Sequence, residues 1–381
     1  MLNRYCTVLL SVLGLSVSSS AEIQYNCSNT QIKKISTDLL SYMSELKIES
    51  SFFNLNETES QIKLSLRTPE QDTNTLDLYT RKEYQIKDDV VYLPVGKGLF
   101  KEVSTTSKKE ILLAMLQHGR TISFTGEYCA VDYLKQNIGI RQNIVAWTEK
   151  LAWVWPDGGP AFWNKKYWIK GTPVKNKKLT EAFNDMFFNQ KKYSIGCYTA
   201  SKMVYAHAVL DYFNRIDKNP ELTRLVEERL MGDDGEPLVH VEPGIMWKFE
   251  KDFPADKEKI PGKVLEIQFG VSAKNFIPGD WSYIINTDPK TYEKIGYEGS
   301  NAIYLGKNRF DDYYADRDQG HYKYEEKMFE VYQWRNGVFS ASRHKNKIKP
   351  IPADVKAKMD LTPEQGGQVF DFRVFPQLFK K

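Results

Sequence analysis

The spacing of apolar residues along the chain predicts a mixture of helices and strands. Apolar side chains three and four residues apart, as on a helix with one buried face, define one group of segments. Apolar side chains that alternate with polar ones, as in half-buried strands, define a second group. The predicted helices span 31–48, 107–116, 141–153, 197–215 and 324–334. The predicted strands span 62–66, 76–78, 90–93, 264–267, 283–285, 301–306 and 310–314, and the charged stretch 217–262 is predicted to be rich in loops.

The first 21 residues have a pattern of their own. A short basic start at 1–4 precedes the apolar run 5–17, and small residues follow at 18–21. This order is typical of a secretory signal peptide, with cleavage expected after Ala21. The apolar run is too short to span a bilayer, and no later run reaches the necessary length. We therefore expect a secreted or periplasmic protein without stable membrane insertion.

Charge and composition exclude two broad classes of protein. The 381 residues include 53 Lys and Arg and 49 Asp and Glu, which gives a net charge of +4. A dedicated nucleic-acid-binding protein needs a clustered basic excess to neutralise phosphates, so we expect no nucleic-acid partner. Hydrophobic residues make up 41% of the chain and aromatic residues 13%, which is enough for a folded core and excludes a disordered chain.

The cysteine count limits the disulfide chemistry. Without Cys6 in the leader, three cysteines remain at 27, 129 and 197. An odd count in an exported protein leaves one thiol unpaired, and the simplest pairing joins Cys27 to Cys129 and leaves Cys197 free. Three unpaired thiols are the alternative, because the sequence does not fix the connectivity. The five histidines lack metal-ligand spacing, so we expect no metal and no other cofactor.

Cys197 stands where a helix is predicted to begin. Ser194 is a candidate N-cap, so Cys197 falls in the first turn, where the partial positive charge of the helix end favours a thiolate over a thiol. Gly196, directly before it, would let a substrate backbone approach closely. The strands predicted downstream could present a base to this thiol. This order resembles papain-like cysteine enzymes, although many cysteines on apolar helices are inert core residues.

Tryptophan is concentrated shortly before this segment. Five of the eight Trp residues fall between Trp147 and Trp168. Such a cluster could line an apolar groove that keeps water from a reactive intermediate. Tryptophan is also simply a large core residue, and we favour core packing.

Five short motifs between residues 139 and 340 carry a family resemblance. They are Arg141–Ala146, Lys166–Trp168, Gly196–Ala200, Gly279–Tyr283 and Gly299–Gly306. In order and spacing they resemble bacterial protein-glutamine gamma-glutamyltransferases of the spore-coat type, which are small cysteine transglutaminases with an NlpC/P60-like, papain-related core. The resemblance implies an α+β fold in which the nucleophile helix packs on an antiparallel sheet, here with an additional N-terminal α/β region.

The resemblance also implies the residues of the site. Cys197 falls on the nucleophile of that family. The family has one glutamate directly before this cysteine and a catalytic glutamate between the glycine and the asparagine of the last motif, where this chain has Gly196 and Ser300. Two residues could replace the missing base. Glu298 shares a face with Ser300 at strand spacing, and His321 is the commoner kind of partner for a thiol, so we favour His321.

The implied function is acyl transfer, in which Cys197 forms a thioester with a protein glutamine and a lysine amine resolves it into an isopeptide crosslink. The expected partners are proteins with such glutamine and lysine side chains. A cysteine hydrolase (a deamidase, amidase or peptidase) and a non-catalytic relative are the alternatives. We expect a signal peptide at 1–21, an N-terminal α+β region at 22–120 that is a pro-segment or a docking domain, a transglutaminase-like domain at 121–340 and a basic, solvated tail at 341–381.

Overall fold

The computed structural model describes most of the chain from residue 22 to residue 374. The described residues are 22–156, 159–169, 171–174, 176–230, 266–268, 271, 273–286, 291, 296–314, 321–335, 352–359 and 369–374. The signal peptide expected over 1–21 lies outside them. Within these ranges no helix is long and apolar enough to cross a membrane.

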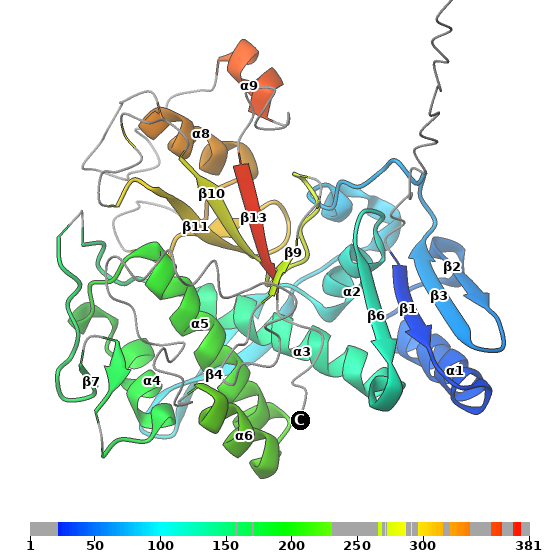
Figure 1. Ribbon diagram of the computed structural model, residues 1–381, viewed down its shortest axis with the longest axis horizontal. Helices are drawn as coiled ribbons and strands as arrows, with labels where there is room; N and C mark the ends of the chain where they lie inside the picture. The colour runs from blue at the N-terminus through cyan, green and yellow to red at the C-terminus, as the bar shows by residue number, and fades with distance from the viewer. Residues whose placement is uncertain are drawn as a thin grey trace, which may run out of the picture.

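A four-stranded sheet flanked by helices forms the N-terminal part of the chain (Figure 1). Its elements are β1 (Glu22–Asn26), α1 (Asn29–Glu45), β2 (Phe53–Glu57), β3 (Gln61–Leu66), α2 (Lys108–Leu116) and β6 (Thr121–Thr125). The strand order is β2-β3-β1-β6, in which β1 pairs antiparallel with β3 and parallel with β6. Buried side chains of both helices and of the strands, among them Ile35, Leu112 and Leu64, form one core. The helices predicted at 31–48 and 107–116 are confirmed within a few residues.

The strand predicted at 76–78 is wrong. Leu76 and Leu78 are buried, but the chain turns here into a 3₁₀ helix at Leu78–Thr80. The side-chain oxygen of Asn74 accepts a hydrogen bond from the Leu76 N–H at 2.9 Å. Bonds of this local kind compete with a sheet ladder and favour a turn.

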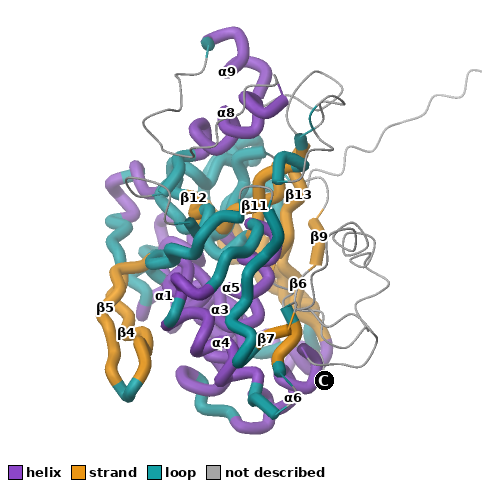
Figure 2. Tube along the Cα trace, turned by 90° about the vertical axis from the view of Figure 1, so that its left-hand side faces the viewer, coloured by secondary structure: helices purple, strands orange, loops and turns teal. Residues whose placement is uncertain are grey.

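A two-stranded hairpin follows the 3₁₀ segment. It consists of β4 (Asp89–Gly96) and β5 (Leu99–Thr105) and confirms the strand predicted at 90–93. The side chains of Leu93 and Val103 are buried in the core of the second half of the molecule. Tyr92 and Phe100 are each 58% exposed, and Figure 2 shows the hairpin projecting from the side of the molecule.

The second half of the chain packs helices on both faces of an antiparallel sheet (Figure 1). The helices are α3 (Val131–Thr148), α4 (Leu179–Phe188), α5 (Cys197–Asp211), α6 (Pro220–Leu230), α8 (Tyr324–Arg335) and α9 (Ala353–Met359). The strands are β7 (Trp168–Ile169), β8 (Thr172–Pro173), β9 (Glu266–Gln268), β10 (Trp281–Ile285), β11 (Gly299–Tyr304), β12 (Phe310–Asp311) and β13 (Val369–Val374). Five of these strands form one sheet, in the order β12-β11-β10-β13-β9.

The two faces of this sheet are covered by different helices. Trp281 of β10 and Ile303 of β11 belong to the core that contains α5. Ile284 and Ala302, which point the other way at strand spacing, pack with Met328 of α8. The expected α+β class, with a helix packed on an antiparallel sheet, is confirmed.

Two further expectations fail within the described residues. Residues 220–230 of the stretch expected to be loop form α6, because Asn219 caps the helix by accepting from the Leu222 N–H at 3.0 Å and Pro220 fits the first turn. Residues 369–374 of the tail expected to be solvated form β13, which pairs with β10 on one side and β9 on the other. Both segments lie among charged residues, so neither the helix nor the strand was predicted from the sequence.

Buried polar contacts join the N-terminal region to the second sheet. Arg120, just before β6, forms an ion pair with Asp280, which Arg141 of α3 contacts from the other side at 2.8 Å. The three side chains are almost completely buried. The turn after β11 adds a second connection, because the Lys307 N–H donates to Glu110 of α2 at 2.7 Å. The region before residue 120 is therefore bonded to the strands that carry the site.

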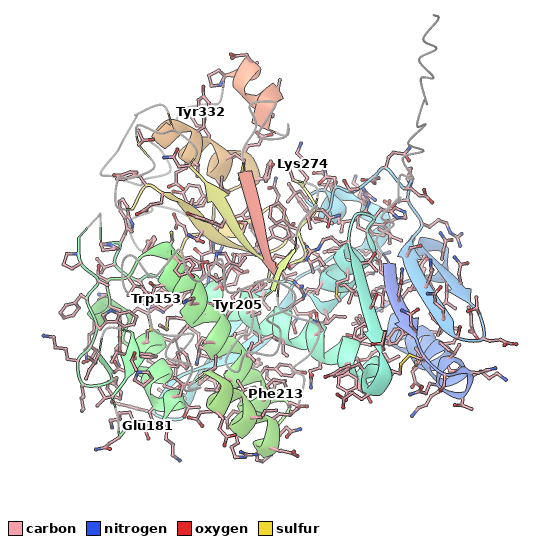
Figure 3. The ribbon with its side chains drawn as sticks, viewed as in Figure 1. Trp153, Glu181, Tyr205, Phe213, Lys274 and Tyr332 are labelled. Carbon is pink, nitrogen blue, oxygen red and sulfur yellow. A yellow bond between two sulfur atoms is a disulfide. The ribbon has the colours of Figure 1, made fainter. Side chains whose placement is uncertain are left out.

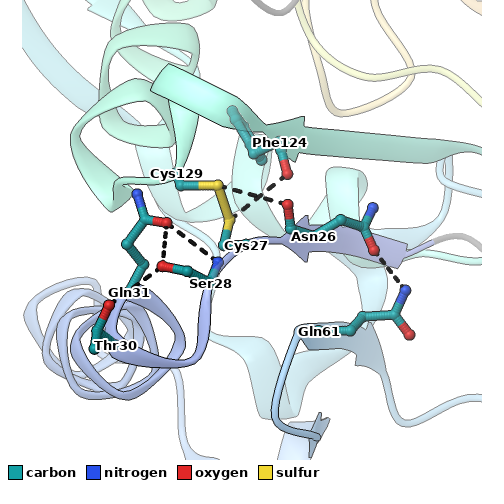
Figure 4. Close-up of a disulfide and its surroundings, with 8 residues drawn as sticks. All are labelled: Asn26, Cys27, Ser28, Thr30, Gln31, Gln61, Phe124 and Cys129. Carbon is teal, nitrogen blue, oxygen red and sulfur yellow. Dashed lines mark hydrogen bonds between the residues drawn. A yellow bond between two sulfur atoms is a disulfide. The ribbon is translucent and has the colours of Figure 1, made fainter.

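A disulfide fastens the end of β1 to the segment before α3 (Figure 4). It joins Cys27 and Cys129, which are 102 residues apart in the sequence. Cys197 is free. The pairing predicted from the odd cysteine count is confirmed.

Candidate active site

Cys197 is the first residue of α5. Its predecessor Gly196 is the N-cap, in an extended conformation, so the first-turn position expected for Cys197 is confirmed. Ser194 does not cap the helix, because its backbone is paired with Phe162 in a β-bridge. The residues of α5 that follow Cys197 are buried, whereas Cys197 itself is half-buried. The thiol therefore lies where the helix meets solvent, beside N–H groups that have no partner within the helix.

Side chains near β12 hold the start of α5 in place. Ser201, one turn after Cys197, donates to the Cys197 carbonyl at 2.9 Å. Its hydroxyl also lies 2.6 Å from the hydroxyl of Tyr313, and the Tyr314 hydroxyl donates to the Ile195 carbonyl at 2.9 Å. Burial raises the pKa of Tyr313 well above its ordinary value, so this phenol stays neutral. These contacts fix the segment from 195 to 201.

One side chain of the sheet reaches the sulfur. Asn301 of β11 lies with Nδ2 at 3.4 Å from the Cys197 Sγ, and its Oδ1 accepts from the Trp281 indole N–H at 2.8 Å. Both Asn301 and Trp281 are buried. The sequence motifs contain these residues, but sequence reasoning assigned them no role. Every residue of β11 is buried, so no burial pattern in the strand marks which side chains face α5.

The side chains of Ser300 and Glu298 form their hydrogen bonds away from the Cys197 sulfur. Ser300 is next to Asn301 in the strand and therefore points to the opposite face, where its hydroxyl lies 3.5 Å from Glu330 of α8. Glu298 lies before β11 and accepts from the Gly296 N–H at 2.9 Å. Burial raises the pKa of Glu298, and these backbone contacts lower it less. Neither side chain is hydrogen-bonded to the sulfur in the part of the chain that the structure describes.

His321 lies in a partly buried ionic cluster at the end of α3. Its Nε2 is 2.9 Å from Glu149, and its Nδ1 is 3.9 Å from Asp311. Arg309 approaches the same Glu149 carboxylate at 3.0 Å. Burial lowers the pKa of His321, but hydrogen bonds to Asp311 and Glu149 raise it more, to about 9. The structure therefore brings His321 to carboxylates rather than to the thiol.

The tryptophan cluster is mainly core. Trp147, Trp153, Trp163 and Trp168 are buried in the core that contains α5, as we favoured. Trp155 is only partly buried, and its ring meets that of Tyr297 edge-on at 6.3 Å. Trp155 is thus the member of the cluster that the core does not fully enclose.

These residues permit nucleophilic chemistry at sulfur. A half-buried thiol at a helix start, with an amide donor beside it, is placed to act as a nucleophile. No group of three His, Cys, Asp or Glu side chains within the described ranges is placed to hold a metal ion.

A protein-family model described as protein-glutamine gamma-glutamyltransferase matches residues 95–316. The match covers more than half of the 381 residues and includes Cys197, Trp281 and Asn301. The chain belongs to this family. The resemblance drawn from the five motifs is confirmed, and with it the enzyme class. The part that matches the transglutaminase family begins before the boundary expected at residue 121 and ends before His321.

One similar solved structure is a transglutaminase from Geobacillus stearothermophilus without its C-terminal extension. It has 21% sequence identity and a TM-score of 0.35, and the similarity covers 52% of this chain and 83% of that chain. No curated protein matches this chain. Membership of the transglutaminase family therefore rests on the family model.

Proposed function

We propose that this protein is an exported transglutaminase that crosslinks proteins through a thioester on Cys197. The observation that carries the proposal is the free, half-buried Cys197 at the start of α5 inside the matched region. The helix end favours the thiolate, and backbone N–H groups there can stabilise the oxyanion that forms on the glutamine carbonyl. The leader pattern of residues 1–21 and the Cys27–Cys129 disulfide support export.

The reaction has two steps that balance in protons. The Cys197 thiolate attacks the glutamine carboxamide carbon, the C–N bond breaks, and the nitrogen takes up one proton and leaves as ammonia. A lysine amine then attacks the thioester, loses one proton as the isopeptide bond forms, and returns Cys197 to the thiolate. The candidates for the proton acceptor, His321 and Glu298, stay predictions.

Amine incorporation tests this proposal. Wild type, Cys197→Ser and Cys197→Ala are incubated with a glutamine-containing protein and a labelled primary amine. We expect wild type to incorporate the amine and both variants to lose the activity while their circular dichroism and thermal unfolding match wild type. Activity in either variant within about threefold of wild type would show that Cys197 is not the nucleophile.

The same assay separates the alternatives. Conversion of glutamine to glutamate without amine incorporation identifies a hydrolase, because water then replaces the amine as acceptor. Absence of both products, with a folded wild-type protein, identifies a non-catalytic relative. Mass spectrometry of the substrate glutamine distinguishes all three outcomes.

A further inference from the structure

The amide of Asn301 has a fixed orientation. Trp281 presents its indole N–H to Asn301 at 2.8 Å, and an indole N–H only donates hydrogen bonds. The amide atom that faces Trp281 must therefore be the oxygen. The NH2 group is left to face the Cys197 sulfur, 3.4 Å away, as a donor.

We propose that Asn301 donates the hydrogen bond that stabilises the Cys197 thiolate, and that Trp281 is the positioning residue that keeps the donor turned toward the sulfur. This inference rests on the proposed function of Cys197 as the nucleophile. A donor stabilises a thiolate more than a thiol, because the charged sulfur is the stronger acceptor. The helix N-terminus beside Cys197 acts in the same direction.

The surroundings hold Trp281 and Asn301 in this arrangement. Trp281 is fully buried, and Asn301 is 3% exposed. The indole packs against two rings of α5, Tyr198 at 5.4 Å and Tyr205 at 6.2 Å between centroids, so it cannot turn away. Tyr205, labelled in Figure 3, also donates its hydroxyl hydrogen to the Gly279 carbonyl just before β10. Little water competes for the buried hydrogen bond between Trp281 and Asn301, so the orientation of the Asn301 amide is well fixed.

Titratable groups on the elements around Cys197 have contacts of their own. Lys202 of α5 lies with its ammonium 5.0 Å from the centre of the Tyr198 ring. Tyr313, after β12, is hydrogen-bonded to Ser201, and Glu298, before β11, is bonded to the Gly296 N–H. Among the described residues, Asn301 is the side chain that is hydrogen-bonded to the sulfur.

The experiment measures how fast iodoacetamide alkylates Cys197 in the full chain, by mass spectrometry of the Cys197 peptide between about pH 4 and pH 10. This readout needs no transferase substrate, so it tests the donor even if the proposed function fails. Asn301→Ala removes the donor, Asn301→Asp replaces it with a negative charge at equal size, and Trp281→Phe removes the indole N–H. Ser282→Ala is the control, because it removes a 3.2 Å hydrogen bond between β10 and β11 on the opposite face.

We expect Asn301→Ala to alkylate at least about tenfold more slowly at neutral pH, with a profile whose midpoint moves to higher pH. Asn301→Asp should be slower still, Trp281→Phe intermediate, and Ser282→Ala equal to wild type. The proposal is overturned if both Asn301 variants keep the wild-type rate, or if Ser282→Ala slows as much as they do. A wild-type rate in Trp281→Phe would remove Trp281 from the proposal. If Asn301→Ala does not fold, Asn301→Asp and Trp281→Phe decide the outcome.

Discussion

The His321 ring lies at the C-terminal end of α3, where its Nε2 atom is 2.9 Å from Oε2 of Glu149. Glu149 is also the C-cap residue of that helix, so the negative helix end and the carboxylate attract the same proton. Glu149 is buried and His321 is half-buried, and the pair connects α3 with the segment before α8.

This pair makes stability depend on pH. The pKa of His321 is about 9 in the folded protein and 6.5 in a free side chain, so the folded state binds the proton more tightly. The stabilisation is complete below pH 6.5 and is lost as the pH rises through about 9. We expect the free energy of unfolding in urea to fall by up to about 3 kcal/mol from this group over that range. The loss should disappear in His321→Gln, and an equal loss in wild type and variant would contradict it.

His321 is also a candidate for the base that takes the proton of the Cys197 thiol. Because both ring nitrogens face carboxylates, we expect His321→Ala to leave the pH profile of Cys197 alkylation unchanged. Glu298→Gln is measured beside it. A lower rate in His321→Ala alone would identify His321 as the base, and a change in Glu298→Gln alone would identify Glu298.

Asp280 should be far more important to stability than a surface acid. Burial raises the pKa of Asp280, but Arg120 and Arg141 lower it more, so the carboxylate stays charged. Asp280→Asn keeps the size and removes the negative charge that two buried guanidinium groups share. We expect it to lower the free energy of unfolding by about 3–5 kcal/mol in urea titrations. The exposed ion pair of Arg224 and Glu228 provides the control, and Glu228→Gln should cost less than about 1 kcal/mol.

The Cys27–Cys129 disulfide should stabilise the folded protein by restricting the unfolded chain. Joining residues 102 apart restricts the unfolded ensemble, so we expect Cys27→Ser/Cys129→Ser to lower the free energy of unfolding by about 2–5 kcal/mol. Titration of denatured, non-reduced protein cleaved after Ala21 should give about one free thiol per chain. About three would show that no bridge forms in solution.

The sequence predicted the local parts of the site well. The helix start at Cys197 was predicted from the apolar spacing of 203–210 and from Ser194 as N-cap, although Gly196 is the actual cap. The disulfide follows from an odd cysteine count, and both predictions depend on few residues. Features that depend on pairing between distant segments could not be predicted from the sequence. The parallel pairing of β1 with β6 joins segments about a hundred residues apart, and no local pattern reveals it.

The side chain beside the sulfur was missed for a related reason. The family pattern drew attention to Ser300, and strand spacing then led to Glu298. Spacing shows that these two share a face, but the face that meets Cys197 depends on where α5 packs. Since Ile303 packs with α5, the odd-numbered positions of β11 face the thiol, and Asn301 is one of them.

The position of β13 has a consequence for biosynthesis. β10 carries Trp281, yet one of its two neighbours is made from residues 369–374, more than eighty positions further along the chain. A folding chain therefore exposes an unpaired edge of β10 until residues 369–374 pair with it, and such edges promote aggregation. The sheet beside Cys197 is complete only when residues 369–374 have joined it, so truncation within β13 should lower solubility before any effect on catalysis can be measured.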